Sequence, residues 1–157
     1  MSQAIHHAFE REQLIRFSHC DPAGIVFFPQ YLVMTNMLVE DWFNQALGIP
    51  YAGLLGPRRV GLPIVRLEVD FTAPSRLGDT VRLGLSVERL GSRSLTLAFG
   101  CRGGEGGREA RFNARQVLVC TSLDSHRAID MPADMRSAVQ TFVEQQPATT
   151  GLQETHA

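Results

Sequence analysis

The sequence has few cysteines and no long apolar run. Its three cysteines form no Cys-x-x-Cys pair, which argues against a disulfide framework and favours reduced thiols in a cytoplasm. No stretch approaches the roughly 20 apolar residues that a membrane helix needs, and the opening residues MSQAIHHAFERE contain no apolar segment typical of a signal peptide. We therefore expect a cytoplasmic protein without a membrane segment.

The sequence also lacks strong charge and the motifs of several enzyme classes. Its formal net charge is −1, so there is no basic footprint for nucleic acid. No Gly-x-Ser-x-Gly or His-Glu-x-x-His motif is present, and the neighbours His6 and His7 have no cluster of further ligands. The glycines of residues 103–107 do not have the spacing of a phosphate-binding loop. We therefore expect no serine hydrolase with a Gly-x-Ser-x-Gly motif, no metal site and no glycine-rich phosphate-binding loop.

What remains is the composition of a globular protein, with 157 residues of which 44% are hydrophobic. Tyr31, Met34, Leu38 and Trp42 recur at helical spacing, and Gly48 with Pro50 marks a stop. Strands are predicted for residues 9–17, 65–71, 81–87, 94–101 and 108–123, the last with a bulge near 117–119. We expect a long helix over 31–47 and a short one over 132–143. The remaining segments are a loop or short irregular piece over 48–62, a loose arm over 1–8 and a flexible tail over 144–157.

The three middle strands alternate apolar and polar residues, which is typical of antiparallel strands with one buried face. The order of a strand, a long helix and then four strands predicts an α+β protein. We expect an antiparallel five-stranded sheet around one central helix, forming a single domain over residues 1–157.

The stretch RFSHCDPAGIVFFPQY, residues 16–31, is the most informative part of the chain. Pro22 biases Asp21 away from helical geometry, Gly24 permits a positive φ, and Pro29 suits the first turn of a helix. Asp21 therefore precedes a helix N-terminus, where backbone N–H groups lack partners. On spacing alone, an Asx-turn or a helix cap is the commoner role for such an aspartate. A carboxylate beside oriented donors also suits acyl transfer.

The run DPAGIVFFPQY resembles the signature of the 4-hydroxybenzoyl-CoA thioesterase family, and the resemblance extends from about Glu12 to Asp134. It implies the hotdog fold and hydrolysis of an acyl-CoA, with an aromatic acyl group preferred, to free acid and CoA. By this resemblance Asp21 is the catalytic nucleophile or general base, and the backbone N–H of Phe28 stabilises the oxyanion. No cofactor is implied, because coenzyme A is part of the substrate. Hotdog proteins pair their sheets, so we expect at least a homodimer, with a homotetramer common in the family.

Further binding residues follow from the same resemblance. Gly24, Phe27, Tyr31 and Asn36 are candidates for the substrate site, and Arg93 and Arg127 are candidates for binding the CoA phosphates. Weaker phosphate candidates are Arg58, Arg59 and Arg89. In the 4-hydroxybenzoyl branch an acidic residue on the long helix meets the ring hydroxyl, whereas the matching position here is Asn36. An amide can still bond a hydroxyl but carries no charge, so the 4-hydroxybenzoyl group itself stays an open question.

Several alternatives stay open at the level of sequence. Cys20 flanks Asp21 but has no evident orienting partner, so a buried structural thiol is the commoner case. His19 would point away from Asp21 if the backbone is extended. Other possible functions are a short-chain acyl-CoA thioesterase and a non-catalytic acyl-CoA-binding module. A hotdog hydratase is disfavoured, because its Asp-x-Asn-Pro-x-His motif is absent.

Overall fold

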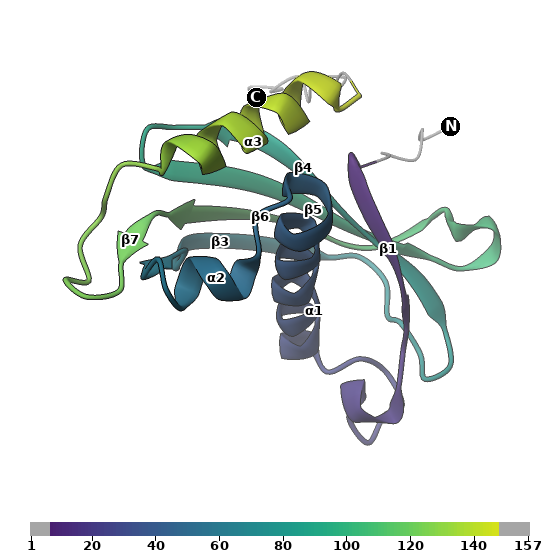
Figure 1. The fold of residues 1–157 in the computed structure, drawn as a ribbon. Helices are drawn as coiled ribbons and strands as arrows, with labels where there is room; N and C mark the ends of the chain where they lie inside the picture. Colours follow the sequence, from purple (N-terminus) through teal and green to yellow (C-terminus); the bar gives the residue numbers. More distant parts are fainter. Residues whose placement is uncertain (1–6, 148–157) are drawn as a thin grey trace, which may run out of the picture.

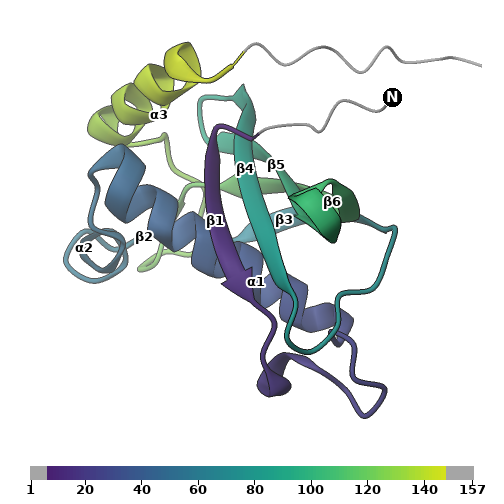
Figure 2. The same ribbon diagram turned by 90° about the vertical axis from the view of Figure 1, so that its right-hand side faces the viewer.

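A computed structural model describes residues 7–147, so most of the expected N-terminal arm and most of the expected tail lie outside the described residues. Five antiparallel strands form the main sheet in the order β1-β4-β5-β6-β3. These strands are β1 (Phe9–Leu14), β3 (Ile64–Phe71), β4 (Thr80–Leu90), β5 (Ser94–Gly103) and β6 (Glu109–Val119). Figures 1 and 2 show the strands curving around the helix α1. The predicted α+β architecture is confirmed.

The central helix begins earlier than its apolar pattern predicted. Helix α1 covers Phe28–Asp41, with Pro29 in its first turn, and it continues as the π-helix η2 (Trp42–Leu47). Gly48 ends it with a φ of 67°, in the left-handed region that glycine adopts readily. Pro29 explains the early start, because its missing N–H has no partner to lose in a first turn.

The smaller elements surround this helix and sheet. They are the 3-10 turns η1 (Phe17–His19) and η3 (Glu105–Gly107), the short helix α2 (Tyr51–Leu55), the paired short strands β2 (Val60–Gly61) and β7 (Thr121–Ser122), and the helix α3 (Ala133–Gln145). The segment 48–62, predicted as a loop or a short irregular piece, contains the short elements α2 and β2. Within residues 7–147, no helix is long and apolar enough to cross a membrane.

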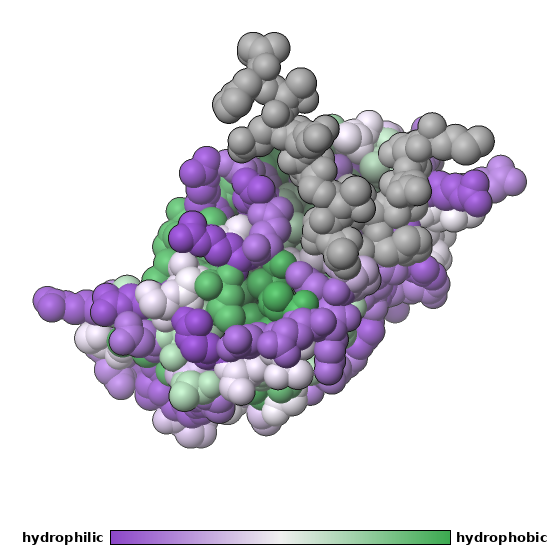
Figure 3. All heavy atoms as spheres, turned by 90° about the horizontal axis from the view of Figure 1, so that it is seen from above, coloured by the Kyte–Doolittle hydropathy of each residue, from purple (hydrophilic) through white to green (hydrophobic). Residues whose placement is uncertain are grey.

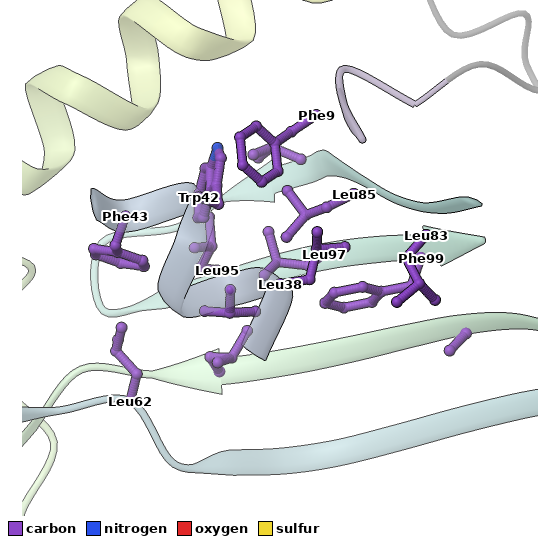
Figure 4. Close-up of a cluster of buried hydrophobic side chains, with 14 of the residues drawn as sticks. Phe9, Leu38, Trp42, Phe43, Leu62, Leu83, Leu85, Leu95, Leu97 and Phe99 are labelled. Carbon is purple, nitrogen blue, oxygen red and sulfur yellow. The ribbon is translucent and has the colours of Figure 1, made fainter. Parts of the chain in front are cut away.

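The core lies between α1 and the inner face of the sheet. Leu38 and Trp42 point from the helix toward the strands, and they meet the alternating apolar residues of β4 and β5, such as Leu85 and Leu97 (Figure 4). All four side chains are nearly or fully buried. Burial of this kind stabilises a fold by about 1.5–3 kcal/mol per large apolar side chain. The core therefore fixes α1 rigidly across the sheet, and with it the loop that enters α1.

Helix α3 closes one side of this core. Its Met135 and Val139 are buried, and Phe142 packs edge-on against Trp42 with ring centres 5.3 Å apart. The face seen from above in Figure 3 carries hydrophilic side chains around a smaller hydrophobic area. The predicted short helix over 132–143 is thus present, displaced by one or two residues at each end as is usual for helix boundaries.

Strand β3 differs from its prediction in two ways. Its apolar residues were expected to be buried, but Val65 is 62% exposed and Phe71 is 50% exposed. The reason is that β3 is an edge strand of the sheet, so one side of it has no neighbouring strand among residues 7–147. It also carries the bulge that was predicted near 117–119 of β6: Ile64 pairs with Leu118 and Arg66 with Val117, so the extra residue is Val65 of β3.

Candidate active site

Asp21 lies in a small hairpin formed by residues 19–27. The backbone N–H of Asp21 donates to the carbonyl of Ile25 (3.1 Å), and that of Phe27 donates to the carbonyl of His19 (2.9 Å). Gly24 lies near the tip with a φ of 76°, and a Cβ there would meet nothing within 4 Å. Backbone conformation, and not lack of space, is therefore what favours glycine at this position.

The turn between β3 and β4 supports this hairpin from outside. Val26 donates its N–H to the carbonyl of Ser75 (2.9 Å), and Leu77 donates to the carbonyl of Gly24 (3.1 Å). Ile25 and Arg76 form an isolated antiparallel bridge between these bonds. The hairpin and the turn together make a short three-stranded arrangement, so backbone hydrogen bonds join the Asp21 segment to the turn between β3 and β4.

The carboxylate of Asp21 is only partly used by the fold. Its Oδ1 accepts the N–H of Ala23 (2.8 Å), which is an Asx-turn. The side chain is half-buried, and no hydrogen bond to its Oδ2 is formed within residues 7–147. The structural role considered for this aspartate is therefore real, but it occupies one oxygen and leaves the other available.

The first N–H of α1 is also available. Phe28 is the first residue of the helix, and the preceding Phe27 offers no side-chain cap. Among the described hydrogen bonds none uses the Phe28 N–H, and Pro29 has no N–H at all. A partnerless donor at a helix N-terminus, where the macrodipole adds partial positive charge, is suited to a developing oxyanion.

The side chains of Phe27 and Phe28 place aromatic surface next to the Phe28 N–H. They are 48% and 56% exposed, and their ring centres lie 5.5 Å apart. Phe28 also packs edge-on against Phe71 of β3 at 6.1 Å. An exposed aromatic pair next to polar groups is a typical lining for an apolar or aromatic ligand.

Tyr31 lies below this surface, inside the core. Its hydroxyl donates to the buried Oγ of Ser75 (2.7 Å), and burial raises the pKa of the tyrosine. Its ring packs against Phe112 with a centre-to-centre distance of 4.8 Å. Tyr31 thus supports the turn that carries Ser75. Its predicted contact with substrate is untested and stays a prediction.

Asn36 is exposed on α1, further along the helix than the Asp21 hairpin. The two alternatives to Asp21 are tied to Arg16 instead: Arg16 donates its backbone N–H to Nδ1 of His19 (2.9 Å), and Cys20 donates its thiol to the carbonyl of Arg16 (3.5 Å). Both side chains therefore contribute to the turn η1 that precedes the hairpin.

The two candidate phosphate-binding arginines come together elsewhere. Cys120 donates its N–H to the carbonyl of Arg93 (2.7 Å), and Ser122 donates to that of Arg127 (2.9 Å), so both lie along the segment that follows β6. Arg93 forms an ion pair with Asp130 (2.7 Å). For Arg127 no ion pair is formed within the described residues. Figure 1 shows this region beside β7, away from the lower end of α1 where the Asp21 hairpin lies.

The weaker phosphate candidates in this region are also paired. Arg58 bonds Asp134 through both terminal nitrogens at 2.8 and 2.7 Å, and Arg59 bonds Asp124 at 3.0 Å. The hydrogen bond from Arg58 lowers the pKa of Asp134 below its usual value. Pairing of this kind leaves little net positive charge at Arg58 and Arg59.

The described residues show no gathered metal ligands. Between residues 7 and 147, no three His, Cys, Asp or Glu side chains are placed to hold an ion. Of the other two cysteines, Cys101 is fully buried, and burial raises the pKa of its thiol to about 12. Burial likewise raises the pKa of Cys120 to about 11. Neither thiol has the low pKa of a reactive cysteine.

Comparison with known protein families assigns the chain to one of them. The family model described as the thioesterase-like superfamily matches residues 15–139. The chain belongs to this superfamily. This confirms the family resemblance found at residues 16–31, while the roles of individual site residues stay predictions.

Two proteins with similar sequences carry names that state an activity. The 1,4-dihydroxy-2-naphthoyl-CoA hydrolase of Synechocystis is 22% identical over 83% of this chain and 94% of its own length. The 4-hydroxybenzoyl-CoA thioesterase of a Pseudomonas species is 27% identical over 78% of this chain and 91% of its own. The structure of that Pseudomonas enzyme matches with a TM-score of 0.75, and a Staphylococcus aureus protein solved in complex with CoA matches over 99% of this chain and 98% of its own at 15% identity, with a TM-score of 0.82. The hotdog fold is thereby confirmed.

Proposed function

We propose that this protein hydrolyses acyl-CoA thioesters to a free acid and CoA, and that the acyl group is a hydroxylated aromatic one. A single observation carries the proposal. The hairpin that holds Asp21 runs directly into α1, so a carboxylate with a free Oδ2 and the free N–H of Phe28 belong to one rigid loop. Hydrolysis of a thioester requires these two groups, one to attack or to remove a proton and one to stabilise the oxyanion.

The chemistry follows from these two groups. The thioester carbonyl oxygen accepts a hydrogen bond from the Phe28 N–H, which stabilises the negative charge that develops on it. Asp21 then acts in one of two ways. Its Oδ2 attacks the carbonyl carbon and expels the CoA thiolate, and water cleaves the resulting mixed anhydride. Alternatively, it takes a proton from a water molecule that attacks instead. Both routes yield the acid and CoA, and neither needs a cofactor or a metal.

The aromatic preference is supported by the relatives and by the lining of the site. The two named relatives act on dihydroxynaphthoyl-CoA and hydroxybenzoyl-CoA, both of which carry ring hydroxyls. Phe27 and Phe28 offer exposed aromatic surface beside the proposed oxyanion donor. The exposed amide of Asn36 can donate to or accept from a ring hydroxyl, although without the charge of a carboxylate.

We also propose that the working form is at least a dimer, with a tetramer as the larger form. Arg93 and Arg127 lie away from the Asp21 hairpin of the same chain, so a CoA ester that reaches both would be bound between copies. Strand β3 supplies a suitable surface, because it is an unpaired edge with exposed apolar residues such as Val65 and Leu67. We place this assembly in the cytoplasm, in keeping with three free cysteines.

The assembly is tested by sedimentation equilibrium of the wild type beside Val65→Arg. The variant places a charge at a position that is 62% exposed in the single chain, so it should fold normally. We expect the wild type to sediment as a dimer or tetramer and Val65→Arg to shift it toward the monomer. A monomeric wild type would contradict the proposed assembly.

The function is tested by measuring CoA release from a panel of acyl-CoA esters. The panel should contain benzoyl, hydroxybenzoyl and dihydroxynaphthoyl esters beside acetyl, butyryl and octanoyl esters. We expect hydrolysis of the hydroxylated aromatic esters with the highest kcat/KM. A preference for butyryl-CoA would instead identify a short-chain thioesterase. Binding of CoA esters without release of CoA would identify a non-catalytic acyl-CoA-binding module.

A further inference from the structure

Arg111 is a buried charge that the proposed chemistry does not use. Its side chain is only 6% exposed. It is the extra residue of a β-bulge, since Cys101 pairs with Phe112 whereas the next residue Arg102 pairs with Ala110. The bulge breaks the alternation of β6, so the consecutive residues Arg111 and Phe112 are both buried. A bulge commonly redirects a side chain in this way, and bulges are frequent next to active sites.

The guanidinium of Arg111 holds both ends of the turn between β3 and β4. Its Nη1 donates to the carbonyl of Pro74 and also lies 3.3 Å from Oδ2 of Asp79. The same carboxylate oxygen accepts the backbone N–H of Arg76 (2.8 Å). Nη2 of Arg111 lies 3.4 Å from Oε2 of Glu109. One buried cation therefore determines where this turn begins and where it ends.

The surroundings of Arg111 leave its guanidinium little freedom. A Cβ added at Gly103 would lie 2.9 Å from Nη2 and 3.0 Å from Cζ, so the guanidinium packs directly on the glycine backbone. The carbonyl of Arg111 itself accepts the N–H groups of Thr72 (3.0 Å) and Ala73 (3.3 Å), which start the same turn. Both the side chain and the backbone of Arg111 thus fix the turn.

The same turn supports the Asp21 hairpin through two backbone hydrogen bonds, from the Val26 N–H to the carbonyl of Ser75 and from the Leu77 N–H to the carbonyl of Gly24. We infer that Arg111 is a positioning residue of the site: by holding the turn it fixes the Asp21 carboxylate relative to the Phe28 N–H. Arg111 touches no reacting atom. The effect on catalysis rests on the proposed function, whereas the effect on the hairpin does not.

The test compares Arg111→Gln with a matched control, Arg102→Gln. Arg102 lies on the neighbouring strand β5, its side chain is 12% exposed, and it bonds Glu10 of β1 at 2.6 Å. The control therefore removes an almost equally buried ion pair that does not touch the turn. Each variant is measured for Tm, for kcat and KM with the best ester of the panel, and for hydrogen exchange at the amides of Val26 and Leu77.

We expect both variants to lose thermal stability, but only Arg111→Gln to lower kcat, by about 100-fold, because small misplacements of reacting groups have effects of this size. Its KM should stay unchanged, since the lost contact acts on positioning and not on substrate binding. Exchange at Val26 and Leu77 should accelerate in Arg111→Gln alone. Arg111→Lys, which keeps the charge, should recover part of kcat.

Equal kcat and equal exchange in the two glutamine variants would overturn the inference. If Arg111→Gln does not fold, Gly103→Ala replaces it, because the added methyl displaces the guanidinium while Arg111 is kept. If the wild type hydrolyses no ester of the panel, the proposed function fails. The exchange of the Val26 and Leu77 amides then still decides whether Arg111 holds the hairpin.

Discussion

The two ends of this fold use their polar groups differently. At the lower end of α1 in Figure 1, backbone hydrogen bonds hold the Asp21 hairpin, and the carboxylate gives only Oδ1 to an Asx-turn. Beside β7, Arg58, Arg59 and Arg93 are each matched by an aspartate. A charged residue on the surface is therefore not automatically available for binding. At the Asp21 hairpin the Oδ2 oxygen and the Phe28 N–H have no partner within the described residues, because other groups form the hydrogen bonds that hold the loop.

The largest effect in this comparison is expected from Asp21→Asn. The amide oxygen can still accept the N–H of Ala23, so the turn and the stability should change by less than about 0.5 kcal/mol. Removal of the carboxylate should lower kcat by about 1,000-fold, the range of acid–base and nucleophilic contributions. Release of CoA is followed with a thiol reagent. Activity within tenfold of the wild type would remove Asp21 from the chemistry.

A smaller effect is expected from Gly24→Ala, which strains the hairpin without filling space. A non-glycine residue at a φ of 76° costs about 1–2 kcal/mol, and misplacement of Asp21 should lower kcat by about tenfold. The matched control is Gly48→Ala at the end of η2, where φ is 67° and a Cβ also meets nothing within 4 Å. Both should lose similar stability in urea unfolding. If the control loses as much kcat, the hairpin has no special role.

At the other end, Arg127→Ala should weaken binding and leave chemistry intact. Arg127 has no ion pair within the described residues, so its charge is available for a phosphate. Loss of a charge-assisted hydrogen bond should raise KM by about tenfold with kcat unchanged. The difference from the wild type should shrink as salt is added, because exposed charges are screened. An effect on kcat alone would contradict a binding role.

Arg93→Ala should have a weaker effect than Arg127→Ala, because Asp130 already pairs with Arg93 at 2.7 Å. We expect KM to rise by about threefold, which corresponds to the modest net value of an exposed charge. Asp130→Asn sharpens the comparison, since it releases Arg93 and should lower KM below that of the wild type. A KM that rises in Asp130→Asn would show that the ion pair itself shapes the binding region.

The smallest effect is expected from Cys20→Ser. The serine hydroxyl can replace the thiol in its bond to the carbonyl of Arg16, so kcat should stay close to that of the wild type. At pH 8 iodoacetamide should label Cys20 before Cys101, because burial raises the pKa of Cys101 to about 12 and keeps it a thiol. A large loss of kcat in Cys20→Ser would return Cys20 to consideration as the nucleophile.

Much of the fold was predictable because local patterns dominate it. The alternation of Val81, Leu83, Leu85 and Val87 identified β4, and helical spacing identified most of α1. Strand β3 has the same alternation, but its residues are exposed, because a pattern shows which face is apolar and not whether the chain itself covers that face. The π-helix η2 was not predicted, since its residues continue the same apolar helical pattern.

The candidate site was predictable only in its local part. Asp21, Gly24 and the Phe28 N–H are close in sequence, and the structure brings them into one loop. The partners that act from a distance were not found: the buried bond from Tyr31 to Ser75 and the pairing of Arg93 with Asp130 join residues far apart in the chain. Arg111 was not found because the sequence does not show that Arg111 and Phe112 both point inward. The bulge that turns both side chains inward is known only from the pairing of β6 with β5.

Asp21 should carry the chemistry while the arginines carry the binding of CoA, and calorimetry of Asp21→Asn with benzoyl-CoA tests this separation most directly. The measurement is the Kd of the variant, together with the amount of intact ester recovered after titration. We predict that the variant binds the ester at least as tightly as the wild type binds CoA, that the further change Arg127→Ala raises this Kd about tenfold, and that the ester is recovered intact. An Asp21→Asn variant that hydrolyses the ester at the wild-type rate, or that no longer binds it, would contradict the account.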